Sequence, residues 1–271
     1  LASATVQENY FADMGFVQRI ENYDAIRDTV LRVGFNDNIA KIAYSIRPKK
    51  GKITRHNINL NNVYYTNSDW SFNELLNELN YLIAFRNTAE FELGATRNEI
   101  ELLFPFSFVS EGEPLPPGRY AFENVSTSFS SDERKVISFG LGGQTGSFYN
   151  GKLHQANADV NFRVQPWGNL GFGYQWNNLD FPDPYGNEII TAFLGKLEIG
   201  FNKNLLWTTL FQYVDQNEFM GINSRLQWRF APMSDVFLVF IDNYDVFNGI
   251  ANRRDVRTNN RAVIVKINYW Y

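Results

Sequence analysis

Cysteine is absent from this chain of 271 residues, and histidine occurs only at positions 56 and 154. Without cysteine the chain can form no disulfide, no thiolate metal site and no cysteine nucleophile. Neither histidine has a second ligand nearby in the sequence at a spacing typical of metal sites. Composition therefore excludes several classes of redox, zinc and thiol enzyme.

Long apolar runs are also missing. No stretch of about 18 or more apolar residues exists, which excludes a transmembrane helix. The first residues, Leu1-Ala-Ser-Ala4, lack the basic start and apolar core of a signal peptide. Because an exported protein needs such a peptide, we expect the sequence to be a mature or partial product.

Aromatic and amide residues are abundant. The chain has 24 Phe, 14 Tyr and 6 Trp, yet the mean hydropathy is negative at -0.32 because Asn and Gln are frequent. Such a combination suits a lipid-facing surface around a wet interior. The net charge is -4 and no basic run occurs, so we expect no nucleic-acid partner.

The last ten residues alternate with the period of a strand. Val263, Val265, Ile267, Tyr269 and Tyr271 fall on one wholly apolar face. The other face is mixed and contains Ile264, Lys266, Asn268 and Trp270. This pattern is typical of the closing strand of an outer-membrane barrel, and it also fits the edge strand of a soluble sandwich.

Four earlier segments alternate in the same way, at residues 155–164, 170–177, 193–202 and 221–230. Their largest rings lie at strand ends on the apolar side, whereas the core of a sandwich would hold them in mid-strand. Aromatic girdles at membrane interfaces require placement at the strand ends. The rings in question are Trp176, Phe201, Trp228, Phe230, Tyr269 and Tyr271.

The connections give a second criterion. With the C-terminus taken as periplasmic, the long loops predicted at residues 99–118, 178–188 and 242–260 all fall on the outer side, and the inner turns are short. A first hairpin is predicted from residues 29–35 and 40–47 around Asn36-Asp-Asn38. The total is about 14 strands.

The sequence therefore predicts an all-β fold, a transmembrane antiparallel up-and-down β-barrel of about 14 strands, with a range of 12 to 16. Residues 1–27 are predicted to be an irregular periplasmic or lumenal segment, and residues 28–271 to be the barrel. We expect an outer-membrane location in a Gram-negative bacterium, contact with lipid and lipopolysaccharide, and recognition of the C-terminal strand by the barrel-assembly machinery. Other envelope proteins or glycans are further candidate partners.

Several segments resemble a known family. They are Ala12-Asp-Met-Gly-Phe-Val-Gln-Arg19, Gly221-Ile-Asn-Ser-Arg-Leu-Gln-Trp-Arg-Phe230, Ser234-Asp-Val-Phe-Leu-Val-Phe240 and Asn260-Arg-Ala-Val-Ile-Val-Lys-Ile-Asn-Tyr-Trp270. Together they resemble the C-terminal barrel of a Bacteroidetes-type outer-membrane family of uncharacterised function. In that family the barrel follows a domain resembling family-9 carbohydrate-binding modules, and members are often labelled membrane-associated hydrolases. The sugar-binding-like domain is absent from this sequence, and the resemblance carries no catalytic signature.

One set of polar residues is predicted to face the lumen. Charges there must be paired or hydrated, because an isolated buried charge is too costly. They could line a ligand or permeation path, but we favour a network of ion pairs and amides that neutralises itself. The candidates are Asp159, Asn161, Arg163, Lys196, Glu198, Arg225, Arg229 and Lys266.

A second set consists of acidic residues predicted in outer loops. They could hold Ca²⁺, which takes carboxylate and carbonyl oxygens, or act as general acid and base in glycoside hydrolysis. Solvated loops are the simpler interpretation, and no other cofactor is predicted. The residues are Asp180, Asp183, Glu188, Asp242, Asp245 and Asp255.

The loop between residues 99 and 118 is rich in aromatic residues and proline. Phe104-Pro-Phe-Ser-Phe108 and Glu113-Pro-Leu-Pro-Pro-Gly118 could stack on sugar rings or a partner, or fold over the barrel mouth as a stiff lid. Three hypotheses for function follow: a membrane anchor or component of a larger envelope assembly, an outer-membrane hydrolase acting through loop carboxylates, and a diffusion channel. The sequence leaves open whether the chain is an enzyme.

Overall fold

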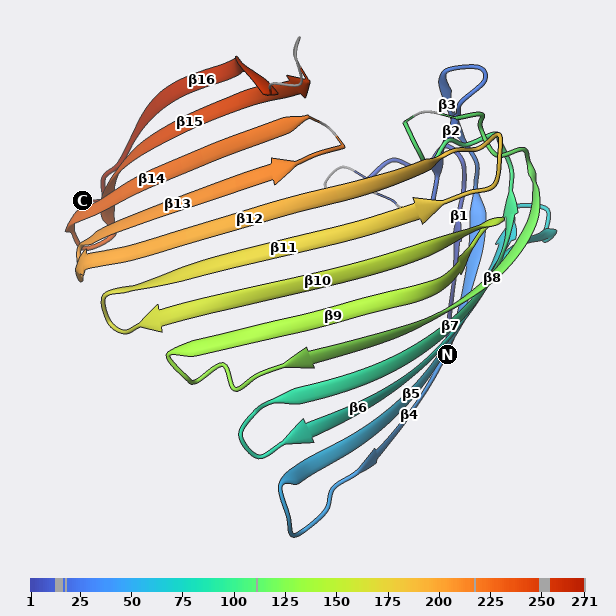
Figure 1. Cartoon of the computed structure of the whole chain (residues 1–271), viewed down its shortest axis with the longest axis horizontal. Helices are drawn as coiled ribbons and strands as arrows, with labels where there is room; N and C mark the ends of the chain where they lie inside the picture. Colours follow the sequence, from blue (N-terminus) through green and yellow to red (C-terminus); the bar gives the residue numbers. More distant parts are fainter. Residues whose placement is uncertain (13–16, 18, 111, 217, 249–253, 271) are drawn as a thin grey trace. The chain divides into compact units, whose positions relative to one another are not determined.

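We analysed a computed structural model, which describes residues 1–12, 17, 19–110, 112–216, 218–248 and 254–270 (Figure 1). A 14-stranded antiparallel sheet follows the chain order, and β2 and β3 form a separate two-stranded sheet. The strands are β1 (Ala2–Val6), β2 (Glu21–Asp24), β3 (Thr29–Arg32), β4 (Phe35–Ile46), β5 (Ile53–Asn67), β6 (Phe72–Phe85), β7 (Glu90–Leu102), β8 (Gly118–Ser130), β9 (Ile137–Phe148), β10 (Gly151–Val164), β11 (Gly168–Asp180), β12 (Asn187–Asn202), β13 (Leu205–Val214), β14 (Phe219–Ala231), β15 (Ser234–Asn248) and β16 (Arg254–Asn268).

No helix in the described part of the chain is long and apolar enough to cross a membrane.

The all-β antiparallel prediction is confirmed, and so is the number of strands in the main sheet. The predicted closure into a barrel is not present. Among the described residues, β1 and β16 each pair with a single neighbour, β4 and β15, so both edges of the sheet stay open. β1 is too short to cover the whole of β4, which leaves no full-length strand at that edge.

The predicted first hairpin is wrong, because residues 35–46 form the single strand β4. Asn36 looks like a turn residue but is buried within the strand. Its amide nitrogen donates to the Thr66 hydroxyl at 3.1 Å and to the Asn67 carbonyl at 2.9 Å, and its amide oxygen accepts from the Thr5 hydroxyl at 2.8 Å. Tertiary hydrogen bonds therefore override the local turn signal.

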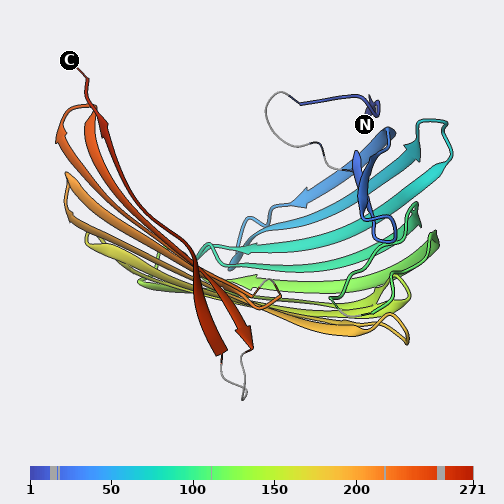
Figure 2. The same cartoon turned by 90° about the horizontal axis from the view of Figure 1, so that it is seen from above.

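The prediction of an irregular segment at residues 1–27 is wrong in two places. Residues 2–6 form β1, which pairs antiparallel with β4 from Ala2 opposite Ile39 to Val6 opposite Phe35. Residues 21–24 form β2, which pairs with β3 in a hairpin. Both views place this hairpin beside the loop ends of the neighbouring strands (Figures 1 and 2).

The chain divides into two compact units, which we describe separately. Unit 1 contains Leu1–Phe129, Gly142–Gln155 and Asn178–Ile189, and unit 2 contains Ser130–Leu141, Ala156–Asn177 and Ile190–Tyr271.

Most of the buried apolar side chains of unit 1 lie where its loops meet. Ile20 and Leu115 are each only 2% exposed, and Phe181 is 5% exposed. The loop at residues 103–117 doubles back on itself through two backbone hydrogen bonds between Phe106 and Leu115. Ala25, in the turn between β2 and β3, donates its backbone N–H to the Pro105 carbonyl at 2.9 Å. A small apolar core thus holds the β2–β3 hairpin and this loop together.

Replacing Leu115 with alanine is expected to loosen this core. A buried Leu→Ala change costs about 2–5 kcal/mol through lost burial and the cavity left behind, and residues 103–117 should then be cleaved faster in limited proteolysis. Val164→Ala, at an exposed position of β10, is the control. Equal cleavage of the two variants would contradict the packing described here.

Candidate functional site

Unit 1 has one exposed apolar face. Paired residues on neighbouring strands point to the same side of a sheet. The pairs Ile42–Leu60, Leu60–Leu79 and Leu79–Ala95 therefore form one row across β4 to β7. A second row runs through the three pairs Tyr44–Ile58, Ile58–Tyr81 and Tyr81–Leu93. The side chains of Ile42, Leu60 and Leu79 are 65%, 44% and 48% exposed, so a broad apolar surface faces the surroundings.

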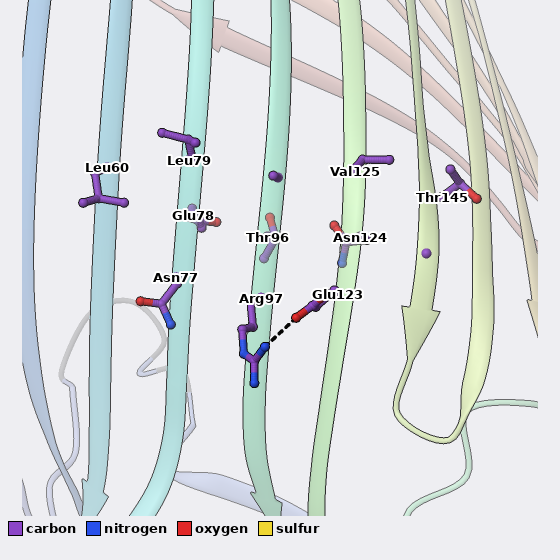
Figure 3. Close-up of a pocket in the computed structure, with 12 residues that line it drawn as sticks. Leu60, Asn77, Glu78, Leu79, Thr96, Arg97, Glu123, Asn124, Val125 and Thr145 are labelled. Atoms are coloured by element: carbon purple, nitrogen blue, oxygen red, sulfur yellow. Dashed lines mark hydrogen bonds and ion pairs between the residues drawn. The ribbon is translucent and has the colours of Figure 1, made fainter.

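This apolar face ends at a sharp polar boundary. The next row toward the loops contains Asn62, Asn77 and Arg97, and the Asn62 amide donates to the Asn77 amide oxygen at 2.7 Å. Arg97 pairs with Glu123 on β8 at 2.6 Å. Figure 3 shows Leu60, Leu79 and Val125 lining a groove, with the Arg97–Glu123 ion pair beside them. The groove has a volume of about 440 Å³.

Unit 2 also has an apolar face. The pairs Ile199–Trp207, Trp207–Leu226, Leu226–Leu238 and Leu238–Val265 form one continuous row across β12 to β16. On the same face Asp242 and Arg261 form an ion pair at 2.7 Å, and they begin the polar end of β15 and β16. The face is therefore apolar toward the short turns and charged toward the other ends of these two strands.

Aromatic rings lie in two groups on the apolar face of unit 2. Near the short turns, Phe230 lies 5.8 Å from Trp228 and 6.5 Å from Tyr269 between ring centroids. In a second group, Phe193 lies 4.8 Å from Tyr174 and 6.3 Å from Tyr213. The group near the short turns agrees with the sequence prediction, whereas in the second group only Tyr213 lies near a strand end, and Tyr174 and Phe193 lie near the middle of β11 and β12. Tyr271 lies outside the described residues.

The eight residues predicted to face a lumen share the opposite face of unit 2. Paired positions run from Glu198 through Thr208 to Arg225. Alternation along the strands places the other members on the same side. A Cβ atom added at Gly171 would meet both Asn161 and Lys196, which links β10 to β12 on this face. The structure thus brings these residues to one polar face, without a closed lumen around them.

Ion pairs on this polar face are local. Lys196 pairs with Glu198 at 2.9 Å, and Arg229 pairs with Asp235 at 3.2 Å. Asp235 also accepts a hydrogen bond from the Gln227 amide at 2.9 Å. Asp159 lies so close to Gly140 that any side chain there would collide with its carboxylate. This glycine makes room for a charged neighbour, and close approach of this kind is a common reason for glycine within a strand.

A buried ion pair stands at the loop end of unit 1. Arg19 pairs with Glu74 on β6, whose side chain is 7% exposed, and the guanidinium lies 4.0 Å from the centroid of the Tyr65 ring. Burial lowers the pKa of Arg19. Burial raises the pKa of Tyr149, and the nearby positive charge of Arg19 opposes that shift. The rings of Tyr65 and Tyr149 therefore lie beside the charge of Arg19.

Aromatic rings from three connections surround this pair. Phe108 lies 4.5 Å from Tyr149, 5.2 Å from Phe148 and 5.8 Å from Phe181 between ring centroids. Beneath them a cavity of about 260 Å³ is lined partly by Arg19 and Tyr149. The rings of the proline-rich loop therefore pack against other parts of unit 1.

The predicted acidic loop residues are divided between the two units. In unit 1, Asp180 ends β11, Asp183 lies in the connection after it, and Glu188 lies in β12, where it accepts hydrogen bonds from Ser110. No group of three or more His, Cys, Asp or Glu side chains could hold a metal ion in the part of the chain that the structure describes.

The long loop predicted at residues 242–260 is wrong, because β15 continues to Asn248 and β16 begins at Arg254. Asp242, Asp245 and Asp255 therefore lie in strands. Asp245 faces Arg257 across the hairpin and accepts a hydrogen bond from Asn259 at 2.8 Å. Opposite charges and amides paired across two strands stabilise a sheet, so polar composition was a poor sign of a loop here.

Sequence reasoning missed the residues that tie the structure together at the loop end, above all Arg19 and Glu74. Their only local signal is that each is a charged residue next to apolar ones. Their partnership joins positions far apart in the chain, which periodicity does not reveal.

Comparisons with models of known protein families, with curated proteins and with solved structures found no match.

Replacing Glu74 with glutamine should destabilise unit 1 by about 3–5 kcal/mol, because the buried Arg19 charge loses its partner. Urea unfolding in detergent micelles measures this. Glu123→Gln breaks the exposed pair with Arg97, and the expected loss there is only about 0–1 kcal/mol. A loss at Glu74 no larger than that at Glu123 would show that the Arg19 pair does not support the fold.

Proposed function

We propose that this chain forms the membrane-spanning wall of an outer-membrane β-barrel, which serves as a membrane anchor or as a component of a larger envelope assembly. The observation that carries the proposal is the exposed apolar face of each unit, bounded by charged residues at one end. A soluble sheet would cover such a surface with a second layer.

The height of the apolar band fits a membrane. On β15 it extends from the turn at Ser234 to Asp242, which is about 26 Å along a strand that rises about 3.3 Å per residue. If the strand is tilted by about 40° from the membrane normal, the apolar stretch spans a height of about 20 Å. This height is near the roughly 25 Å apolar band of outer-membrane barrels. On β7 of unit 1, the same face runs from Phe91 to Arg97, which is about 20 Å along the strand.

The two aromatic groups of unit 2 support the same placement. Tyr and Trp rings prefer the interface between lipid and water, because each ring has an apolar body and a polar edge. Tyr213, in the group farther from the short turns, donates its hydroxyl to Asp215 at 2.7 Å, as a ring at a wet boundary would. Trp228 in the other group is 52% exposed on the apolar face.

Among the three hypotheses, the packed loop at residues 103–117 favours an anchor or assembly component over a diffusion channel. Phe108 of this loop packs against Phe148, Tyr149 and Phe181, and Ala25 of the β2–β3 turn donates its backbone N–H to the Pro105 carbonyl. A hydrolase gains no such support, because Asp242 is paired with Arg261 and Glu188 accepts hydrogen bonds from Ser110. The family resemblance and the link to glycan handling stay predictions.

Two adjacent substitutions on β10 test the membrane placement. Val160 is exposed on the side opposite the polar face, and Asn161 lies on the polar face. In lipid bilayers, Val160→Arg should lower the free energy of unfolding by about 2–4 kcal/mol, the cost of a charge on the lipid side. Asn161→Arg should cost about 1 kcal/mol or less, because it stays in water.

If the sheet were instead exposed to water on both faces, a different result is expected. At an exposed position in water, the change from valine to arginine is worth about 0.5 kcal/mol at most. Equal and small effects of the two substitutions in bilayers, measured by urea titration of folded protein, would therefore rule out the proposed membrane wall.

A further inference from the structure

Half of β4 has no partner on one side. β1 pairs with residues 35–39 of β4, and its first paired residue, Ala2, lies opposite Ile39. The first half of β4 is buried or half-buried, whereas residues 41–46 are all exposed. In the described part of the chain, the backbone of residues 40–46 faces β5 on one side and no strand on the other.

This open edge is long, regular and amphipathic. Ile42 and Tyr44 point to the apolar face and are 65% and 64% exposed. Lys41, Ala43 and Ser45 point to the other face. An edge of this kind presents unpaired N–H and C=O groups and promotes pairing with another strand. An open edge is less favourable in a membrane than in water, because each unsatisfied backbone group in lipid costs several kcal/mol.

Strand direction limits what can fill the edge. Directions alternate along the order of the sheet, so β4 and β16 run the same way and could pair only as parallel strands. Every neighbouring pair in the sheet is antiparallel, and a parallel pair would be slightly less stable per residue. The β16 edge is therefore a poor match for β4.

A second copy of the chain is also a poor match. Two β4 edges could pair antiparallel about a two-fold axis, but this would point the loops of the two copies to opposite sides of the membrane. The exclusion rests on the proposed membrane placement. Barrels of this class have one fixed orientation, with long loops on one side.

We infer that the edge at residues 40–46 takes a further strand, supplied from outside the described chain, that runs in the direction of β1 and continues its register. Its chemistry follows from the faces of β4. Side chains opposite Ile42 and Tyr44 are apolar, and those opposite Lys41, Ala43 and Ser45 are small or polar. Backbone hydrogen bonds to β4 supply the affinity for the added strand. The alternation of apolar and polar side chains along that strand supplies the specificity, as in β-strand addition.

Because the chain contains no cysteine, a single introduced cysteine is the only thiol that can react. The chain carrying Ala43→Cys is purified in detergent micelles and mixed with a synthetic peptide that alternates valine and threonine. One cysteine on the threonine side of the peptide is activated as a 2-pyridyl disulfide, so that attack by the thiolate introduced into the chain forms the mixed disulfide and releases 2-thiopyridone. Disulfide formation is followed by gel mobility. Asn59→Cys is the matched control, because Asn59 pairs with Ala43 on the same face but lies on β5, which has partners on both sides. Rates are normalised to reaction with a small soluble thiol reagent.

The inference predicts that Ala43→Cys forms the mixed disulfide roughly tenfold faster than Asn59→Cys, because strand pairing raises the local thiol concentration. N-methylation of the peptide amides that face β4 should remove the difference. Equal rates at the two positions would overturn the inference.

Two other products would also overturn it. In a separate experiment without peptide, an added oxidant such as copper phenanthroline accepts the two electrons of disulfide formation. A disulfide between the Ala43→Cys positions of two copies would then identify a second copy as the occupant. An intramolecular disulfide in an Ala43→Cys, Ile264→Cys double variant without peptide would identify β16. The β16 outcome leaves the membrane proposal standing, whereas a disulfide between two copies would also count against the single membrane orientation by which a second copy was excluded. Val160→Arg in bilayers tests the membrane proposal separately.

Discussion

The structure depends on the period-two alternation of side chains along antiparallel strands. Each residue pair joins two side chains on the same face, so a row such as Ile199, Trp207, Leu226, Leu238 and Val265 is built from separate strands by register alone. A slip of one residue would exchange the two faces. The apolar bands, the aromatic groups and the polar face all follow from that register.

Departures from this pattern lie mainly toward the loop ends. Arg97 with Glu123, and Asp242 with Arg261, place opposite charges side by side where each apolar band stops. Beyond the band of unit 1, the chain forms a small core around Leu115 and a buried pair between Arg19 and Glu74. Lipid would supply the apolar environment along the band, and the protein supplies its own at the loop end.

Much of the architecture could be predicted from sequence because alternation is a local signal. The segments at residues 155–164 and 221–230 alternate clearly, and they form β10 and β14 almost as expected. The sequence predictions failed where the conformation of a residue depends on a partner far away in the chain. Asn36 reads as a turn until Thr66 and Thr5 are beside it, and Asp242 reads as a loop residue until Arg261 is opposite. The candidate site shows the same limit, because shared faces are predictable while the Arg19 pair is not.

The most direct test of the membrane placement is a spin-label scan of residues 221–230 in liposomes, one cysteine at a time. Each position is measured for contact with oxygen, which concentrates in lipid, and with a water-soluble relaxation agent. We expect oxygen contact to peak at Ile222, Ser224, Leu226 and Trp228, and water contact to peak at the positions between them, with a period of two. Equal access of the water-soluble agent to both sets would contradict the account of a sheet with one face in lipid.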